Sequence, residues 1–271
     1  MAVTAIPRRR ELSRVARDVV DGFSRHKLLT YASAIAYQII SALIPFALFT
    51  LGLFGLLGLK ELWTDHLKPT IADHASREVV ALADTSVRQV LEHKQTFWVT
   101  FGLALMLWEA SGAMRATMDA LDNIYNVRRR RSSRERYVTS VALAAAVGML
   151  FLLAICALVA GHSLISGVGA VFARYTAAAV LLTAAVGLTM RFAPATSRPF
   201  RWIGGGSVVI VVGWLLTVGG YVLYASNVAS YGSVFGSLAV LFVLIIAIYL
   251  SAIVFLAGVL VEQRAQEEMA K

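Results

Sequence analysis

Long apolar segments alternate with short charged ones along most of the chain. A helix needs roughly 20 apolar residues to cross a hydrocarbon layer of about 30 Å. Six segments approach or exceed that length, at about residues 34–59, 97–118, 138–160, 176–192, 202–224 and 235–261. The second carries charge in its latter part and the fourth is short. The pattern predicts an all-α polytopic membrane protein with six transmembrane helices, forming one membrane domain over residues 34–262.

The distribution of lysine and arginine predicts how these helices are oriented. Short loops rich in basic residues stay on the cytoplasmic side. The basic residues gather in residues 1–33 and in the second and fourth connections, which hold Arg128 to Arg131, Arg134, Arg136, Arg191, Arg198 and Arg201. The fifth connection, residues 225–234, has no charged residue. Both termini, including the tail 263–271, are therefore predicted to be cytoplasmic.

Two segments outside the predicted spans have an amphipathic pattern. In the first connection, residues 60–96, Val79, Ala83 and Val87 recur at helical spacing among charges of both signs. This predicts an extracytoplasmic amphipathic helix, either an interfacial surface helix or a cap over the spans. Residues 1–33 alternate apolar residues with arginines, which suits a helix lying on an anionic cytoplasmic leaflet. We therefore expect anionic membrane lipids as partners.

Composition supports a membrane protein and excludes several other classes. The 271 residues are 58% hydrophobic and 15% charged, whereas about a quarter of the residues of a soluble domain are charged. The net charge of +9 would suit a nucleic-acid-binding protein, but here it follows the topology pattern, so no nucleic-acid partner is expected. The single cysteine, Cys156, and the scattered histidines indicate no disulfide, metal site or cofactor. Self-association into a homo-oligomer stays open.

Glu109 is the clearest ionisable residue inside a predicted span. If the second span enters the membrane near Phe97, Glu109 lies roughly 18 Å deep at 1.5 Å per residue. An ionisable group at that depth is costly and faces the bundle interior or water. A functional role and a buried structural hydrogen bond are both open for it.

A polar stripe on the first span is the second candidate. Gln38, Ser41 and Pro45 lie at i, i+3 and i+7 on one helix face, and the proline removes a backbone hydrogen bond. Together with Glu109 the stripe forms a candidate polar path. The alternative is that these residues join two helices by interhelical hydrogen bonds.

Two further groups are candidates near the ends of the spans. Arg115, Asp119 and Asp122 share one helix face after the second span and can pair with one another, as a salt-bridged helix end or as a proton relay. Asn227 and Tyr231 lie in the uncharged fifth connection, which suits a turn with an interfacial tyrosine or a site for a polar ligand. No catalytic residue and no metal ligand set is predicted.

Several motifs together resemble one known family. The segment Ala32 to Tyr37, with Ser41 and Pro45, forms a first-span motif, and Ala120 to Val127 follows the second span. Further matching positions are Trp108 to Gly112, Pro194, Trp202, Gly206, Trp214, Tyr224 to Ser237, Tyr249 to Ala252, Gly258 and Glu262. They resemble the YihY/BrkB family of bacterial inner-membrane proteins over nearly the whole chain. Phe235-Gly236-Ser237 and Gly258-Val259-Leu260 depart from the family pattern.

The resemblance implies a multi-pass, six-helix protein of the bacterial cytoplasmic membrane, in a family associated with virulence or serum resistance. Some members have carried the name ribonuclease BN, but we expect no enzyme here, because no metal or general-base set accompanies the basic residues. The leading hypothesis is a transporter or permease-like protein for a lipid or small amphiphile. The alternative is a non-transporting envelope protein that organises the membrane or its partners.

Overall fold

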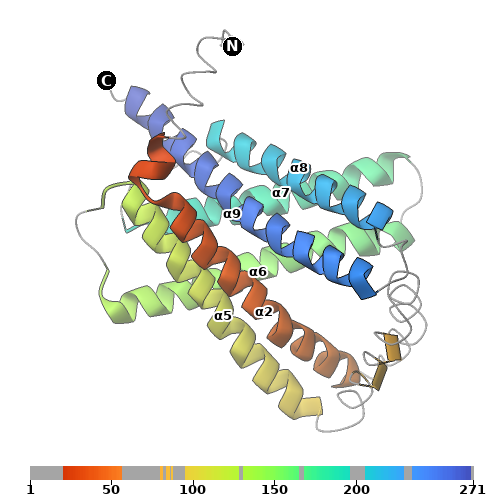
Figure 1. The fold of residues 1–271 in the computed structure, drawn as a ribbon. Coiled ribbons are helices and arrows are strands. Elements are labelled where there is room, and N and C mark those ends of the chain that lie inside the picture. The colour runs from red at the N-terminus through yellow and green to blue at the C-terminus, as the bar shows by residue number, and fades with distance from the viewer. Residues whose placement is uncertain are drawn as a thin grey trace. The chain divides into compact units, whose positions relative to one another are not determined.

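The computed structural model describes residues 21–56, 80, 81, 84, 85, 87, 95–127, 131–164, 168–195, 205–228 and 234–269. Its long helices are α2 (Leu28–Leu56), α5 (Gln95–Ile124), α6 (Ser133–Leu164), α7 (Val168–Phe192), α8 (Gly205–Val228) and α9 (Val234–Met269) (Figure 1). Within these described ranges there is no β-strand. Each of the six helices is long and apolar enough to cross a membrane. The predicted all-α fold with six membrane-spanning helices is confirmed.

The helices extend beyond the predicted apolar segments. The second span was expected to end near residue 118, but α5 continues to Ile124, and α6 already begins at Ser133. The hydropathy pattern ends where charged residues begin, whereas the helix continues because its charged residues find partners on other segments. Asn227, expected in a loop, lies in the last turn of α8. Tyr231 and most of the predicted amphipathic segments lie outside the described residues.

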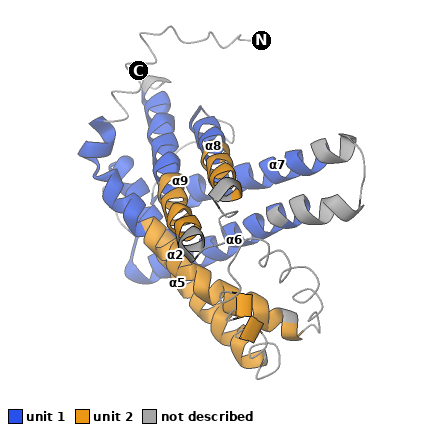
Figure 2. Ribbon diagram, turned by 45° about the vertical axis from the view of Figure 1, so that its right-hand side comes forward, with its two compact units in different colours: residues 1–34, 114–214, 252–271 blue, residues 35–113, 215–251 orange. Residues whose placement is uncertain are grey.

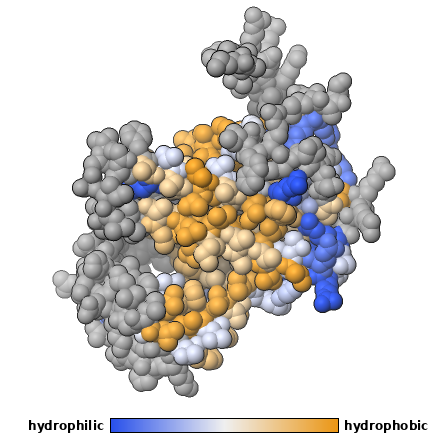
Figure 3. Space-filling model, turned by 180° about the vertical axis from the view of Figure 1, so that it is seen from behind, coloured by the Kyte–Doolittle hydropathy of each residue, from blue (hydrophilic) through white to orange (hydrophobic). Residues whose placement is uncertain are grey.

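Many of the large apolar side chains on the helices are exposed. Ile44 is 71% exposed and Leu216 is 72% exposed, and the described surface in Figure 3 is mainly apolar. Soluble proteins rarely expose apolar patches of this extent, because contact of apolar surface with water is unfavourable. The exposed side chains therefore suit contact with lipid, as expected for a multi-pass membrane protein.

The chain divides into two compact units (Figure 2). Unit 1 comprises residues 1–34, 114–214 and 252–271, and unit 2 comprises residues 35–113 and 215–251. Helices α6 and α7 belong to unit 1 and pack against each other, whereas α2, α5, α8 and α9 contribute segments to both units. The fully buried side chains of unit 1 include Met118, Leu121, Ile124, Val186, Ile210, Leu256 and Leu260.

Glycines allow α8 and α9 to approach closely within unit 1. A β-carbon added to Gly206 would lie 3.2 Å from the amide nitrogen of Glu262 and would collide with the carbonyl oxygen of Gly258. A β-carbon on Gly213 would collide with the side chain of Val254. Small residues allow helices in a membrane to pack at short distance, so these glycines join α8 to α9.

Candidate functional site

In unit 2, glycines of α2 and α5 lie directly against the backbone of the other helix. A β-carbon added to Gly102 of α5 would lie 2.6 Å from the amide nitrogen of Phe49 and 3.0 Å from the carbonyl oxygen of Pro45. A β-carbon added to Gly52 of α2 would lie 2.9 Å from the amide nitrogen of Val99. Real β-carbons do not come this close to backbone atoms, so glycine is required at both positions.

The same contact continues to Gln38, whose side chain lies over Gly112 of α5. The amide carbon of Gln38 is 2.7 Å from the position that a β-carbon of Gly112 would take. From Gln38 to Gly52 the contact advances by 14 residues along α2, while from Gly112 to Val99 it moves back by 13 residues along α5. The two helices are therefore antiparallel and remain in contact over about 20 Å. We call this contact the α2–α5 seam.

Glu109 and Ser41 lie on the two helix faces that form the α2–α5 seam. Glu109 follows Gly102 by seven residues, which is close to two helical turns, so both lie on one face of α5. Ser41 lies on the same face of α2 as Gln38 and Pro45. The antiparallel register places Glu109 level with Ser41. Glu109 is half-buried, and no hydrogen bond or ion pair links its carboxylate to another described residue.

All four residues of the predicted polar path therefore belong to one helix pair. Gln38 and Pro45 contact α5 directly, and the register brings Ser41 and Glu109 to the same contact. The arrangement is compatible with both interpretations of the stripe, as a joint between helices and as part of a path. It offers carboxylate, amide and hydroxyl groups between two apolar helices.

A second polar cluster surrounds the end of α5 in unit 1. Three side chains of the last two turns of α5 each bind a different segment of the chain. Asp119 forms an ion pair with Arg136 of α6. A carboxylate oxygen of Asp122 accepts a hydrogen bond from the backbone N–H of Ala195, at 2.8 Å, just after α7. Asn123 binds His26, which precedes α2. The end of α5 is thus tied to three other parts of unit 1.

Asn123 binds the turn that precedes α2. Its amide nitrogen donates to the carbonyl oxygen of His26 at 3.1 Å, and its amide oxygen is 3.2 Å from Nδ1 of the same histidine. The backbone turns sharply on both sides of this contact, with φ of 51° at Lys27 and at Asn126. At Asn126 the hydrogen bonds Asn126 N–H to Asn123 O and Val127 N–H to Asp122 O form a Schellman motif, which ends α5.

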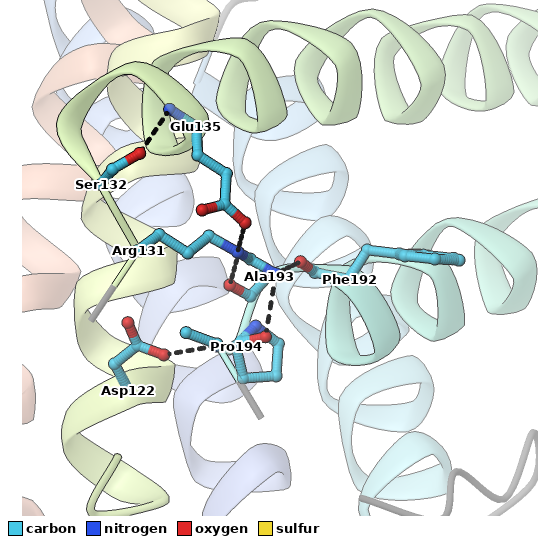
Figure 4. A network of polar contacts seen from close by, with 8 residues as sticks. Asp122, Arg131, Ser132, Glu135, Phe192, Ala193 and Pro194 are labelled. Carbon is cyan, nitrogen blue, oxygen red and sulfur yellow. Dashed lines mark hydrogen bonds and ion pairs between the residues drawn. The ribbon is translucent and has the colours of Figure 1, made fainter. Parts of the chain in front are cut away.

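Arg131 holds the end of α7 (Figure 4). Its guanidinium donates to the carbonyl oxygens of Ala193, Phe192 and Pro194, at 2.8, 2.9 and 3.2 Å. The last carbonyl groups of a helix have no partner within it, and a cation near them also interacts favourably with the helix dipole. The neighbouring Ser132 accepts a hydrogen bond from the N–H of Glu135 at 3.3 Å and so caps the start of α6.

The charged face predicted on α5 makes contacts with other segments. Besides the bonds of Asp119 and Asp122 described above, the guanidinium of Arg115 lies over the ring of Tyr137 of α6, 5.4 Å from its centroid. The sequence pattern identified these three residues but not the segments to which they bind. It also missed Arg131 and His26, because their partners lie 62 and 97 residues away in the chain.

Glu262 is a buried carboxylate that the sequence analysis placed only within a family motif. It is 4% exposed, and one of its oxygens accepts a hydrogen bond from the N–H of Gly206, at 3.1 Å, at the start of α8. Its other oxygen is 3.4 Å from the amide nitrogen of Gln266. A carboxylate is favourable at a helix N-terminus, so Glu262 joins α9 to α8 where Gly206 and Gly258 meet.

The described ranges contain no group of three or more histidine, cysteine or acidic residues arranged to hold a metal ion. Asp119, Asp122 and Glu262 each bind a partner in unit 1, whereas Glu109 lies on the α2–α5 seam in unit 2. The α2–α5 seam is therefore the candidate site, because its Glu109 carboxylate has no hydrogen-bond or ion-pair partner among the described residues.

Comparison with known proteins identifies the family. The chain is similar to the putative ribonuclease-like protein YfkH of Bacillus subtilis (strain 168), with 25% identity over 254 residues, covering 89% of this chain and 91% of that protein. No solved structure matches the chain. The sequence model of the family described as virulence factor BrkB matches residues 19–271, which include all six helices. The resemblance inferred from the motifs is confirmed, and the chain belongs to the BrkB virulence factor family of membrane proteins.

Proposed function

We propose that the protein is a transporter or permease-like protein that moves a lipid or small amphiphile, with the α2–α5 seam as part of the path. The observation that supports this function is the gathering of Gln38, Ser41 and Glu109 on the facing surfaces of two membrane-spanning helices. An acidic residue at the centre of a membrane span costs about 3 kcal/mol. Such a group is retained where it binds a substrate, an ion or a proton.

The proposal includes the location and orientation of the chain. Arg131 lies in the connection between α5 and α6 and Arg136 in the first turns of α6, and the rule of positive loops would place this connection in the cytoplasm of a bacterial cell. With this orientation both termini are cytoplasmic, and the basic arm 1–33 contacts anionic lipids of the inner membrane. The polar cluster around the end of α5 would then hold the helix ends of unit 1 together on the cytoplasmic side.

A ribonuclease activity does not fit our proposal, although the relative from Bacillus subtilis has a ribonuclease-like name. Nucleic-acid binding depends on lysine and arginine that are available to neutralise phosphates. Here Arg131 is bound to three carbonyl groups and Arg136 is paired with Asp119. These arginines stabilise the fold, and we propose that the protein is not an enzyme.

The alternative function is that of a non-transporting envelope protein that organises the membrane or its partners. The observation that favours it is the backbone contact at Gly102 and Gly52, which suits a permanently closed helix pair. Under this alternative, deletion of residues 71–91 harms the cell more than the substitution Glu109→Gln. The transport proposal requires the opposite order of severity.

Reconstitution into vesicles tests the proposal. Movement of labelled phospholipids and small amphiphiles would be compared between wild type and the variants Glu109→Gln and Gln38→Leu. Glu135→Gln is the matched control, because Glu135 is 61% exposed and lies in unit 1. We expect movement by wild type and by the control, and its loss in the two seam variants. A folded wild type that moves none of these compounds would refute the proposal and support the envelope function.

A further inference from the structure

We propose that the α2–α5 seam binds an alkali-metal cation, held by the Glu109 carboxylate together with oxygen atoms of Ser41 and Gln38. The inference rests on the proposed function, to which it would add a coupling ion. It is carried by three observations: the formal charge of the long-helix segments of unit 2, the chemistry of Pro45, and the register of the two helices.

Glu109 is the one formally charged side chain in the four long-helix segments that belong to unit 2. These segments are residues 35–56, 95–113, 215–228 and 234–251. The next charged residue along α5, Arg115, belongs to unit 1 and lies over the Tyr137 ring. A carboxylate without a counter-charge is unfavourable in an apolar environment. One monovalent cation would neutralise it, whereas a divalent cation would leave an excess positive charge.

Pro45 supplies a backbone oxygen on the same side of α2. In a regular helix the carbonyl of Ser41 would accept a hydrogen bond from the N–H of residue 45, but proline has no N–H. Within a membrane, a carbonyl that loses its helical donor needs another partner. Pro45 faces α5, because its own carbonyl oxygen would lie 3.0 Å from a β-carbon on Gly102. The freed Ser41 carbonyl therefore lies on the face of α2 that meets α5.

The register brings the other oxygen donors to this level. Gln38 precedes Ser41 by about one turn on the same face of α2, and its Oε1 is its closest atom to the Gly112 position. On α5, Glu109 precedes Gly112 by about one turn. The hydroxyl and carbonyl of Ser41, the amide oxygen of Gln38 and the carboxylate are all hard oxygen ligands. Helix carbonyls freed at a break serve the same purpose in membrane transporters that bind Na⁺.

Thermal unfolding of the purified full chain tests the cation site without any transport measurement. The protein would be titrated with NaCl or KCl, replacing N-methyl-D-glucamine chloride at constant ionic strength. A ligand that binds the folded state raises Tm, so we expect Na⁺ or K⁺ to raise the Tm of wild type and not that of Glu109→Gln. Binding of radioactive sodium or potassium, measured directly, would confirm that the effect is binding.

Pro45→Ala is the most specific variant, because it removes no side-chain oxygen. Alanine supplies an N–H that can occupy the Ser41 carbonyl, and we expect the half-saturating cation concentration to rise at least about tenfold, which corresponds to about 1.4 kcal/mol of binding energy. Ser41→Ala should act in the same direction. Ser33→Ala is the control, since Ser33 is exposed on the same helix and donates to the carbonyl of Leu29. It should keep the response of wild type.

Two results would overturn the cation site. One is a folded wild type whose Tm and cation binding are the same in all three salts. The other is a stabilisation that follows pH alone and disappears in Glu109→Gln, which would assign the position to a proton. Failure of this inference can be distinguished from failure of the proposed function. Movement of lipid that is independent of Na⁺ and K⁺ removes only the cation site, whereas cation binding without any movement removes only the transport function.

Discussion

The substitution of glycine by alanine at two positions gives opposite predictions, and the pair tests the α2–α5 seam. Gly102 of α5 lies against the backbone of α2, whereas Gly148 of α6 is exposed and has no atom within 4 Å of its β-carbon position among the described residues. In a helix, alanine is more favourable than glycine by about 1 kcal/mol. At Gly148 nothing opposes this gain. We therefore expect Gly148→Ala to be stabilising by up to about 1 kcal/mol.

At Gly102 the same gain is offset by a collision. The added β-carbon would be 2.6 Å from the amide nitrogen and 2.9 Å from Cα of Phe49, and backbone atoms cannot move away by a change of rotamer. Overpacking a close contact costs about 1–3 kcal/mol or more. After subtraction of the helix gain, Gly102→Ala should destabilise the protein by up to about 2 kcal/mol. The two variants should thus differ by the overpacking cost, about 1–3 kcal/mol.

Unfolding in detergent micelles with a denaturing detergent, followed by circular dichroism, measures this difference. Both variants would be compared with wild type at the same protein-to-detergent ratio. If Gly102→Ala is as stable as Gly148→Ala, the two helices do not contact each other at Gly102 as described, and the register of the seam is wrong. A Gly102 variant that is destabilised but still binds the cation would show that cation binding does not require the close helix contact at Gly102.

Two further predictions concern unit 1. Arg131→Ala leaves the buried carbonyl groups of Ala193 and Pro194 without their donor, and at about 1–2 kcal/mol for each group it should cost about 2–4 kcal/mol. Arg134→Ala changes an exposed side chain and should change the stability by less than about 0.5 kcal/mol in the same unfolding assay. Glu262→Ala removes the acceptor for the N–H that begins α8 and should cost about 1–2 kcal/mol, so an unfolding midpoint equal to that of wild type would contradict the buried capping contact.

The hydropathy pattern predicted the helices well because the constraint behind it is simple. A span needs a long apolar run whatever its neighbours are, and each of the six predicted segments lies largely within one helix. The ends were less accessible to prediction. Helix α5 continues through Asp119, Asp122 and Asn123 because each of them binds a segment distant in the chain, and hydropathy carries no information about such partners.

The candidate site was predicted in part for a similar reason. The spacing of Gln38, Ser41 and Pro45 placed them on one face of a helix, which depends on local geometry alone. That this face meets α5 could not be predicted, because pairing of helices depends on shape along the whole contact. The glycines that allow it, Gly102 and Gly112, are ten residues apart and give no recognisable motif.

The hydrogen bonds from Arg131 to the end of α7 change how the basic connection between α5 and α6 should be interpreted. Positive residues in such loops are usually regarded as a signal that is read while the chain inserts into the membrane. Arg131 and Arg136 have contacts that can form only after α5, α6 and the end of α7 are all in place. The same residues would therefore have two effects: they would orient the helices during insertion, and their contacts would then stabilise the inserted arrangement against reversal. Experiments that count or exchange arginines in this loop would measure both effects at once, unless they are restricted to positions outside these contacts.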